Sequence, residues 1–193
     1  MYIPTSFNVS DQKELFAFIK ANAFGQLISS IDNRPFVSHI PFLLDDDKKT
    51  VSCHLAKRNP QWKNIENQEL LITFQGAHDY VSPSWYSSAG VPTWNYQAVH
   101  IYGKATLITE NKALAKLVEA LSNTYEASMQ KPWQPEYKEA MLKAIIGIEI
   151  EITEIQGKYK LSQNRPKADR LHVIEESIKR NSIELAQAMK DTL

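Results

Sequence analysis

The stretch Ile146-Gly147-Ile148-Glu149-Ile150-Glu151-Ile152 decides the fold class of this chain. Its isoleucines occupy every second position, and the positions between them hold glycine or glutamate. Successive side chains of a β-strand point to opposite faces of the sheet, so this strand has one apolar face and one wet face. The alternation predicts an antiparallel sheet. Its phase slips at Thr153-Glu154-Ile155, which predicts a bulge or bend of the kind found where a barrel curves.

Further short strands lie on both sides of this stretch, and helices are inserted between them. The other expected strands cover residues 26–30, 36–44, 50–56, 70–74, 80–86, 93–108 and 157–161. The expected helices cover residues 11–23, 59–65, 111–128 and 136–144 and the chain from residue 168 onward, with an interruption at Asn181-Ser182. This order predicts an α+β protein with an antiparallel barrel or sandwich rather than a parallel βαβ sheet. We expect one domain over 1–193, with 168–193 as a helical C-terminal extension.

Composition excludes several classes of protein. Lys and Arg together number 22, as do Asp and Glu, so the formal net charge is zero, which argues against a broad electrostatic grip on nucleic acid. Cys53 is the only cysteine, which excludes an intrachain disulfide and the cysteine clusters of structural zinc sites. The first residues lack the basic and apolar parts of a signal peptide, and no apolar run approaches the ~20 residues that span a bilayer. We expect a cytoplasmic protein with no membrane association.

The segment from His54 to Trp62 is the most informative place for a ligand. An expected strand ends there, Lys57 and Arg58 follow, Asn59 suits a helix N-cap and Pro60 suits the first helical turn. A helix N-terminus with two adjacent cations could cradle a phosphate. The same residues also fit a basic turn that does no more than start a helix.

Two aromatic segments could meet a flat ligand. In the expected strand over residues 93–108, one face carries Trp94, Tyr96, Ala98, His100 and Tyr102. That face could wall a heteroaromatic ligand, form the centre of a dimer interface or belong to the core. Hydroxyl groups and aromatic rings also alternate in Tyr80-Val81-Ser82-Pro83-Ser84-Trp85-Tyr86, where they could bind a phosphate or a ribityl chain, although a kinked edge strand explains them as well.

Motifs for dedicated catalysis and for metal binding are absent from the sequence. The five histidines have no metal-ligand spacing, and no phosphate-binding glycine loop, dinucleotide fingerprint or nucleophile elbow is present. The two helices expected after residue 168 superficially imitate helix-turn-helix. The second of them has no arginine to read guanine or grip phosphate, so we expect a dimerisation or barrel-covering tail.

Blocks along nearly the whole chain resemble the PaiB family of FMN-binding negative transcriptional regulators. The blocks are Met1-Tyr2-Ile3-Pro4 with Phe7, His39-Ile40-Pro41-Phe42, His54 to Trp62, Ser82-Pro83-Ser84-Trp85-Tyr86, Val91 to Tyr96 with Val99-His100, and Lys160 to Arg165 with Asp169-Arg170. The resemblance implies a split β-barrel like that of pyridoxamine-phosphate oxidases and flavin reductases, and a homodimer with FMN at the subunit interface.

The resemblance also implies roles for residues. A place near the FMN phosphate falls to His54, Ala56, Arg58 and Asn59. Lys57 stands where the family can have a smaller or different residue, and its charge beside Arg58 makes it a further candidate for cofactor binding. A place near the flavin ring or ribityl chain falls to Ser82, Trp85, Trp94, Tyr96, Lys160, Gln163, Asn164 and Arg165. One position departs from the family pattern, because Cys53 stands where a glycine usually precedes the histidine, and its side chain could crowd a ligand that approaches the backbone.

Four functions stay open at the level of sequence. The first is a regulator that binds FMN, and the second is a flavin-dependent oxidoreductase like the flavin reductases, for which no residue is an obvious proton donor. The third is a haem-binding relative with His39, His54 or His100 as axial ligand. The fourth, direct DNA binding as a repressor, follows from the family label and has no support from the residues.

Overall fold

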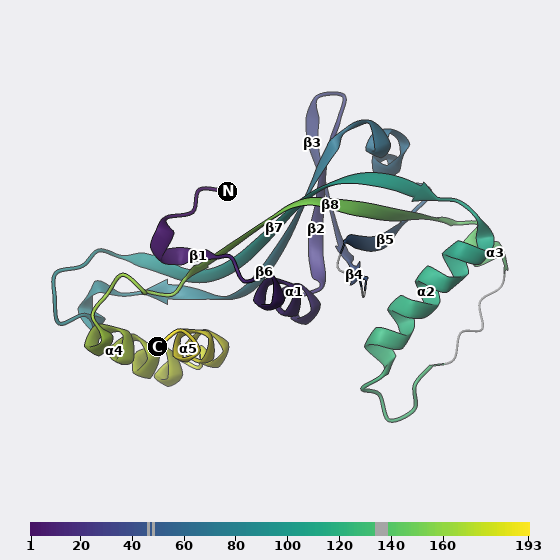
Figure 1. Ribbon diagram of the computed structural model, residues 1–193. Coiled ribbons are helices and arrows are strands. Elements are labelled where there is room, and N and C mark those ends of the chain that lie inside the picture. Colours follow the sequence, from purple (N-terminus) through teal and green to yellow (C-terminus); the bar gives the residue numbers. More distant parts are fainter. Residues whose placement is uncertain (46, 48, 134–138) are drawn as a thin grey trace. The chain divides into compact units, whose positions relative to one another are not determined.

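The computed structural model describes residues 1–45, 47, 49–133 and 139–193 (Figure 1). Within it the chain forms two compact units. Unit 1 consists of residues 1–18, 75–99 and 156–193, and unit 2 consists of residues 19–74 and 100–155. Three long strands contribute residues to both units: β6 (Glu69–Val81), β7 (Thr93–Ile108) and β8 (Ile145–Lys160).

The antiparallel arrangement predicted from the isoleucine alternation is confirmed. The strand order is β3-β2-β6-β7-β8-β5-β4, with the two-residue strand β1 (Asn8–Val9) paired to β8. Strands β2 (Phe24–Ile31) and β3 (Arg34–Pro41) form a hairpin whose two connecting residues, Asp32 and Asn33, have φ of 50° and 61°, as a tight primed turn requires. Strands β4 (Leu43–Leu44) and β5 (Thr50–Ala56) pair with each other, and β5 continues along β8 from Thr50 opposite Glu151 to Ala56 opposite Ile145.

Two expectations about strand continuity are wrong. The separate strand expected over 157–161 is instead the end of β8, which runs from Ile145 to Lys160. The phase slip expected at Thr153-Glu154-Ile155 does occur in the burial pattern of this strand, since Thr153 and Glu154 are both exposed. The separate strands expected over 70–74 and 80–86 are instead the single strand β6, which ends at Val81 before the 3₁₀ turn η3 (Pro83–Trp85). Ladder hydrogen bonds to neighbouring strands hold these stretches extended even where their own apolar alternation fades.

Unit 2 has its core on the isoleucine face of β8. Ile146, Ile148 and Ile150 are at most 2% exposed, whereas Glu149 and Glu151 lie outside. Helix α2 (Asn111–Glu126) buries Leu114, Leu117 and Leu121. It packs so closely on β8 that a Cβ atom at Gly147 would lie 3.0 Å from a carbon of Leu114 and 3.2 Å from a carbon of Leu117. The short helix α3 (Glu139–Leu142) falls inside the helix expected over 136–144, of which residues 136–138 lie outside the described residues.

Unit 1 contains the expected helical tail, split at the expected place. Helix α4 (Lys167–Lys179) and helix α5 (Ile183–Lys190) pack on each other through Val173, Ile174, Leu185 and Met189, all at most 3% exposed. Asn181 turns the chain between them with a φ of 63°. The first 18 residues carry the 3₁₀ turn η1 (Thr5–Phe7) and the start of helix α1 (Gln12–Ala21), which crosses into unit 2. Among the described residues, no helix combines the length and the apolar character that a membrane crossing requires.

Candidate functional site

The predicted ligand-binding residues divide between the two units. His54, Ala56, Lys57, Arg58 and Asn59 lie in unit 2, at the end of β5 and in the turn that follows it. The other eight lie in unit 1. Residues 56–59 are called the basic turn below.

The basic turn is fixed by hydrogen bonds at both of its ends. The Asn59 backbone N–H donates to the Ala56 carbonyl over 2.9 Å, and the Lys57 N–H donates to the Ala144 carbonyl over 2.8 Å. The Trp62 indole Nε1 donates to the Lys57 carbonyl over 3.0 Å. Asn59 also caps the next segment, since its Oδ1 accepts from the Gln61 N–H over 3.0 Å. These hydrogen bonds therefore set the conformation of the basic turn before any ligand binds.

Gln61 ties the basic turn to the sheet of unit 2. Its side chain is 1% exposed, and its Nε2 lies 3.0 Å from both the Leu27 carbonyl and the Ser29 hydroxyl. Its Oε1 accepts from the Ser38 hydroxyl over 2.6 Å, and the same hydroxyl accepts from Asn59 Nδ2 over 2.9 Å. A buried amide whose oxygen and nitrogen both have hydrogen-bond partners rigidifies the segment that carries it.

The cations of the basic turn are free to meet a ligand. Lys57 and Arg58 are exposed, and neither side chain has an ion pair or hydrogen bond with any described residue. His54, at the end of β5, has a buried Nδ1 without a hydrogen-bond partner among the described residues. Burial lowers the pKa of His54, so its imidazole is neutral at pH 7 and can donate or accept there according to its tautomer.

The predicted helix after Asn59 is only partly confirmed. Asn59 caps it as expected, but the segment η2 (Pro60–Asn67) is 3₁₀ rather than α, and Asn64 breaks it with a φ of −131°. The N-terminus of the 3₁₀ segment is present as predicted, and the break comes only after its first turn. The phosphate cradle of this N-terminus with Lys57 and Arg58 stays a prediction.

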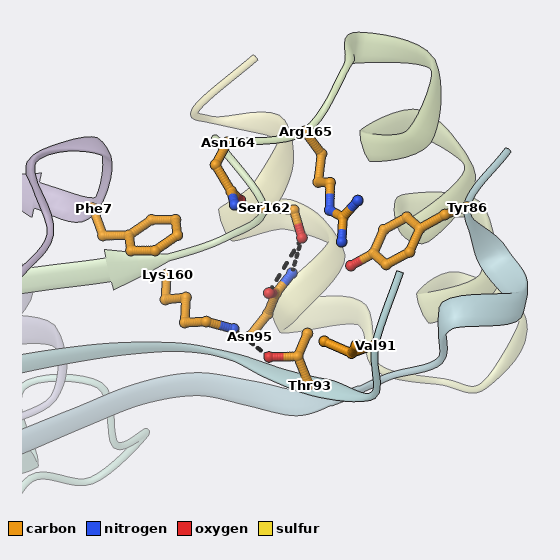
Figure 2. Close-up of a pocket in the computed structure, with 9 residues that line it drawn as sticks. All are labelled: Phe7, Tyr86, Val91, Thr93, Asn95, Lys160, Ser162, Asn164 and Arg165. Carbon is orange, nitrogen blue, oxygen red and sulfur yellow. Dashed lines mark hydrogen bonds between the residues drawn. The ribbon is translucent and has the colours of Figure 1, made fainter. Parts of the chain in front are cut away.

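A second concave site, here the Lys160 pocket, lies in unit 1 (Figure 2). Its volume is about 160 Å³, and Lys160 and Arg165 supply its charge. Lys160 Nζ donates to the Thr93 hydroxyl and to the Trp94 carbonyl, both over 2.6 Å. Burial, and then the charge of Lys158, lower the pKa of Lys160. The full lining is Phe7, Tyr86, Val91, Thr93, Asn95, Lys160, Ser162, Asn164 and Arg165.

Arg165 is held flat against one wall of the Lys160 pocket. Its guanidinium lies 4.4 Å from the centre of the Tyr86 ring, and its Nη1 donates to the Ala89 carbonyl over 3.0 Å. Gly90 allows this stack, because a Cβ there would lie 2.5 Å from the Tyr86 ring and 3.3 Å from Arg165 Nη2. The guanidinium plane is thus oriented by packing as well as by hydrogen bonding.

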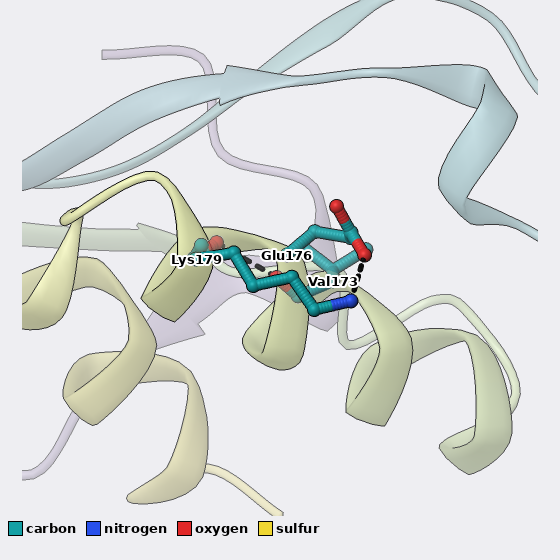
Figure 3. Close-up of polar contacts among 4 residues, drawn as sticks. Val173, Glu176 and Lys179 are labelled. Carbon is teal, nitrogen blue, oxygen red and sulfur yellow. Dashed lines mark hydrogen bonds and ion pairs between the residues drawn. The ribbon is translucent and has the colours of Figure 1, made fainter.

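Asp169 on α4 anchors the loop that carries Tyr86 and Gly90. Its buried carboxylate accepts from the Ser87 N–H (2.8 Å), the Ser87 hydroxyl (2.6 Å) and the Ser88 hydroxyl (2.9 Å). Helix α4 is also bonded internally around Val173 (Figure 3), where the buried Ser177 hydroxyl donates to the Val173 carbonyl over 2.7 Å. The exposed Lys179–Glu176 pair beside it (2.7 Å) adds little to stability.

Replacing Asp169 with asparagine is expected to loosen the 87–90 loop, because the donors of Ser87 and Ser88 lose a charged acceptor. Amide hydrogen exchange at Ser87 should become at least about tenfold faster, which is what the loss of a charged hydrogen bond predicts. The hydrogen bonds from Ser87 hold the pKa of Asp169 below its ordinary value of 3.8. This stabilisation is therefore complete above pH 3.8 and is lost as the pH falls through the lowered value. Asp191→Asn, which makes the acceptor of one exposed hydrogen bond from Gln187 neutral, is the control; equal exchange at Ser87 in both variants would contradict the anchor.

The remaining predicted residues of unit 1 do not line the Lys160 pocket. Ser82 caps η3 and bonds Ser84, and Trp85 lies under the Arg180 guanidinium at 5.7 Å. Tyr96 faces Lys158 Nζ at 5.3 Å, and Gln163 folds back on the Tyr159 carbonyl. Trp94 is 55% exposed and meets the Tyr80 ring edge-on at 6.2 Å.

The burial along β7 decides against the core interpretation of its aromatic face. The opposite face carries the buried residues Asn95, Val99 and Ile101, each 0% exposed. The face with Trp94 and Tyr96 is only partly covered. That this face of β7 forms a dimer interface or the wall of a ligand site therefore stays a prediction.

Several pocket residues were not predicted as site residues from the sequence. Tyr86, Thr93, Asn95 and Ser162 line the Lys160 pocket, and Asn95 Nδ2 donates to the Ser162 hydroxyl over 2.9 Å. Ser162 adopts a positive φ of 64°, a strained backbone that is invisible in the sequence. The one available signal was Asn95, a polar residue on the same face of an expected strand as the apolar residues Val99 and Ile101.

Comparison with known proteins identifies the family and the fold. Residues 1–154 match the family described as "Putative FMN-binding domain". The chain is 40% identical to "Protease synthase and sporulation protein PAI 2" of Bacillus subtilis (strain 168), over 100% of this chain and 98% of that protein.

Two solved structures share the fold at low identity. A flavocytochrome from Azotobacter vinelandii has a TM-score of 0.68 at 17% identity, covering 86% of this chain and 75% of its own. A "Putative Pyridoxamine 5'-phosphate oxidase" from Listeria innocua has a TM-score of 0.50 at 17% identity, covering 75% and 95%. These similarities confirm the predicted α+β split barrel, and the family match confirms the predicted resemblance: the chain belongs to the FMN-binding-domain family that includes the PaiB-type protein PAI 2 of B. subtilis.

Proposed function

We propose that this protein is a cytoplasmic homodimer that binds FMN at its subunit interface, with the phosphate of FMN on the basic turn. One observation carries the proposal: two exposed cations without a partner among the described residues, Lys57 and Arg58, stand on a turn that half-buried hydrogen bonds hold in place. A phosphate monoester offers a charge that such cations complement and oxygens that accept hydrogen bonds. Preorganised donors bind it without a further cost of ordering the loop.

The residues present fit the phosphate end of FMN. His54 Nδ1 is buried without a partner among the described residues, and a buried polar atom of this kind is costly unless a ligand or water satisfies it. His54 lies two residues before Ala56, the first residue of the basic turn. His54 and the basic turn together thus offer one imidazole and two cations to one ligand.

The proposed dimer rests on the aromatic face of β7. Trp94 is 55% exposed and Tyr96 is partly exposed in the single chain, and aromatic residues of this kind are enriched where protein surfaces meet. The volume of the Lys160 pocket, about 160 Å³, is below the range of ordinary cofactor pockets. The proposal therefore does not place the flavin ring in this pocket, and the aromatic face of a second copy would supply its walls.

FMN would supply hydride or electron transfer when bound, while this chain would bind and orient it. A regulatory role is the part of the proposal that follows from the relatives alone. We do not extend it to direct DNA contact, because α5 exposes Ile183, Glu184, Gln187 and Lys190 and no arginine.

Replacing Arg58 with alanine is expected to weaken FMN binding at least about tenfold, because a charged hydrogen bond contributes roughly 1.5–3 kcal/mol. Titration of FMN into the purified protein, followed by the quenching of flavin or tryptophan fluorescence, measures this change. Arg34→Ala is the matched control, since Arg34 is an exposed arginine of the same unit at the β2–β3 turn.

Unchanged FMN affinity in Arg58→Ala, or an equal loss of FMN affinity in Arg34→Ala, would contradict the placement of the FMN phosphate on the basic turn. The absence of FMN binding to the wild-type protein at micromolar concentrations would reject the proposed function itself. The same titration with haemin tests the other cofactor, because both His54 and His100 have a buried Nδ1 without a partner among the described residues. A Soret band that His54→Ala or His100→Ala abolishes would favour haem over FMN.

A further inference from the structure

The Lys160 pocket of unit 1 carries an excess of positive charge. Its lining contains Lys160 and Arg165 and no carboxylate (Figure 2). The nearby Asp169 affects Arg165 electrostatically, but its oxygens accept from Ser87 and Ser88 and it does not line the pocket. A partly enclosed site with two cations and no acid favours an anion.

Hydrogen-bond donors remain available inside the pocket. An ammonium group has three N–H donors, and Lys160 uses two of them, on Thr93 and Trp94. A guanidinium group has five, and the one hydrogen bond of the Arg165 side chain to a described residue goes to Ala89. Figure 2 shows Lys160, at the end of β8, reaching toward Thr93 on β7, and Arg165, from the segment after β8, lying beside Tyr86.

The rest of the lining limits the size and character of the anion. Phe7, Val91 and the ring of Tyr86 are apolar walls. The volume of about 160 Å³ equals that of roughly five waters at ~30 Å³ each, so it holds about five or six non-hydrogen atoms. A carboxylate with a short aliphatic chain matches this size, and it brings one charged end and one apolar end.

The planar guanidinium of Arg165 also favours a carboxylate over a phosphate. Its central carbon lies 4.4 Å from the centre of the Tyr86 ring, and its Nη1 donates to the Ala89 carbonyl, so its position is fixed while other N–H donors stay available. A carboxylate can accept two parallel hydrogen bonds from the fork of a guanidinium. A phosphate carries charged oxygens in all directions and would press some of them on Phe7 and Val91.

We propose that the Lys160 pocket binds short-chain carboxylates, or the carboxylate end of a small molecule, through Lys160 and Arg165. The proposal rests on residues of unit 1 alone, and it needs no bound flavin. It provides the protein with a place for a small organic acid in addition to the proposed FMN.

Calorimetric titration of the FMN-free protein with acetate, propionate and butyrate, and with inorganic phosphate, tests the proposal. Affinity should rise from acetate to butyrate as the chain fills the apolar wall, and phosphate should bind more weakly than butyrate. Arg165→Gln and Lys160→Met should each weaken butyrate binding at least about tenfold. Arg165→Lys, which keeps the charge but loses the fork, should retain part of the affinity.

Arg180→Gln is the matched control, because Arg180 also stacks on an aromatic ring of unit 1, that of Trp85, but does not line the pocket. It should leave butyrate affinity unchanged. Equal loss in Arg180→Gln and Arg165→Gln, tighter binding of phosphate than of butyrate, or no carboxylate binding at millimolar concentrations would each overturn the proposal. An FMN titration of Arg165→Gln keeps the two proposals apart: retained FMN binding leaves the basic turn intact, whereas loss of FMN and butyrate binding together would assign the pocket to the flavin and overturn the separate carboxylate site.

Discussion

Replacing Gln61 with leucine is expected to lower the free energy of unfolding by about 3–5 kcal/mol. Leucine has a similar size, so packing changes little, but it removes every hydrogen bond of a side chain that is 1% exposed. The Leu27 carbonyl and the Ser29 hydroxyl lose a partner at buried positions, and the Ser38 hydroxyl loses one at a half-buried position. A buried polar group left unsatisfied costs roughly 1–3 kcal/mol, and several arise at once.

Gln68→Leu is the matched control for this prediction. Gln68 also makes three hydrogen bonds, to the Ser30 N–H, the Ser30 carbonyl and the Asn64 carbonyl, but in an exposed position. Water can replace those partners, so the expected loss is below about 1 kcal/mol. Denaturant unfolding followed by tryptophan fluorescence measures both variants. Equal losses in the two would contradict the role of Gln61 as a buried hub.

The Gln61→Leu variant should also distinguish an effect on FMN binding from an effect on folding. Gln61 holds Ser38, and Ser38 accepts from Asn59 of the basic turn. Under conditions where Gln61→Leu is still folded, FMN affinity should fall although no residue proposed to contact FMN has changed. This loss would show that the rigidity of the basic turn contributes to binding, as preorganisation requires.

The sheet could be predicted because its pattern is local. β7 runs from Thr93 to Ile108, as expected from the alternation of its own residues, and β5 likewise runs from Thr50 to Ala56. Burial on one face imposes a period of two, and that period is written in consecutive residues. The turn at Asn181 between α4 and α5 was equally local, since the apolar pattern of the tail stops there.

The continuity of β6 and β8 could not be predicted in the same way. Between Glu151 and Gln156 the burial alternation of β8 fades, and only the neighbouring strands keep the backbone extended. The same limit applied to the two sites. The basic turn was visible as a run of residues, but Gln61 reaches Leu27, 34 positions away, and Asn95 reaches Ser162, 67 positions away. No local pattern records such contacts.

Cys53 shows how a sequence comparison and a structure can lead to opposite expectations. The resemblance placed a glycine at this position and raised the concern that a side chain would crowd a ligand. In the structure Cys53 lies on β5 opposite Ile148 and is 0% exposed. Successive residues of a strand point to opposite faces, so the thiol lies in the core of unit 2 and away from the face that carries His54. The departure at Cys53 therefore leaves the proposed phosphate site open.

Labelling of Cys53 by a thiol reagent is consequently expected to be at least about a thousandfold slower in the folded protein than in the denatured chain. Only opening of the core exposes the sulfur, and opening of core strands costs up to the full free energy of unfolding, roughly 5–15 kcal/mol. Burial also raises the pKa of the Cys53 thiol, which leaves little of the reactive thiolate. Because Cys53 is the only cysteine, the absorbance of the released thiolate reports on this one site, with Cys53→Ala as the blank. A folded-state rate within tenfold of the denatured rate would place the thiol at the surface and restore the expected conflict with the ligand. Faster labelling in Gln61→Leu than in Gln68→Leu would instead connect both predictions to the stability of the same core.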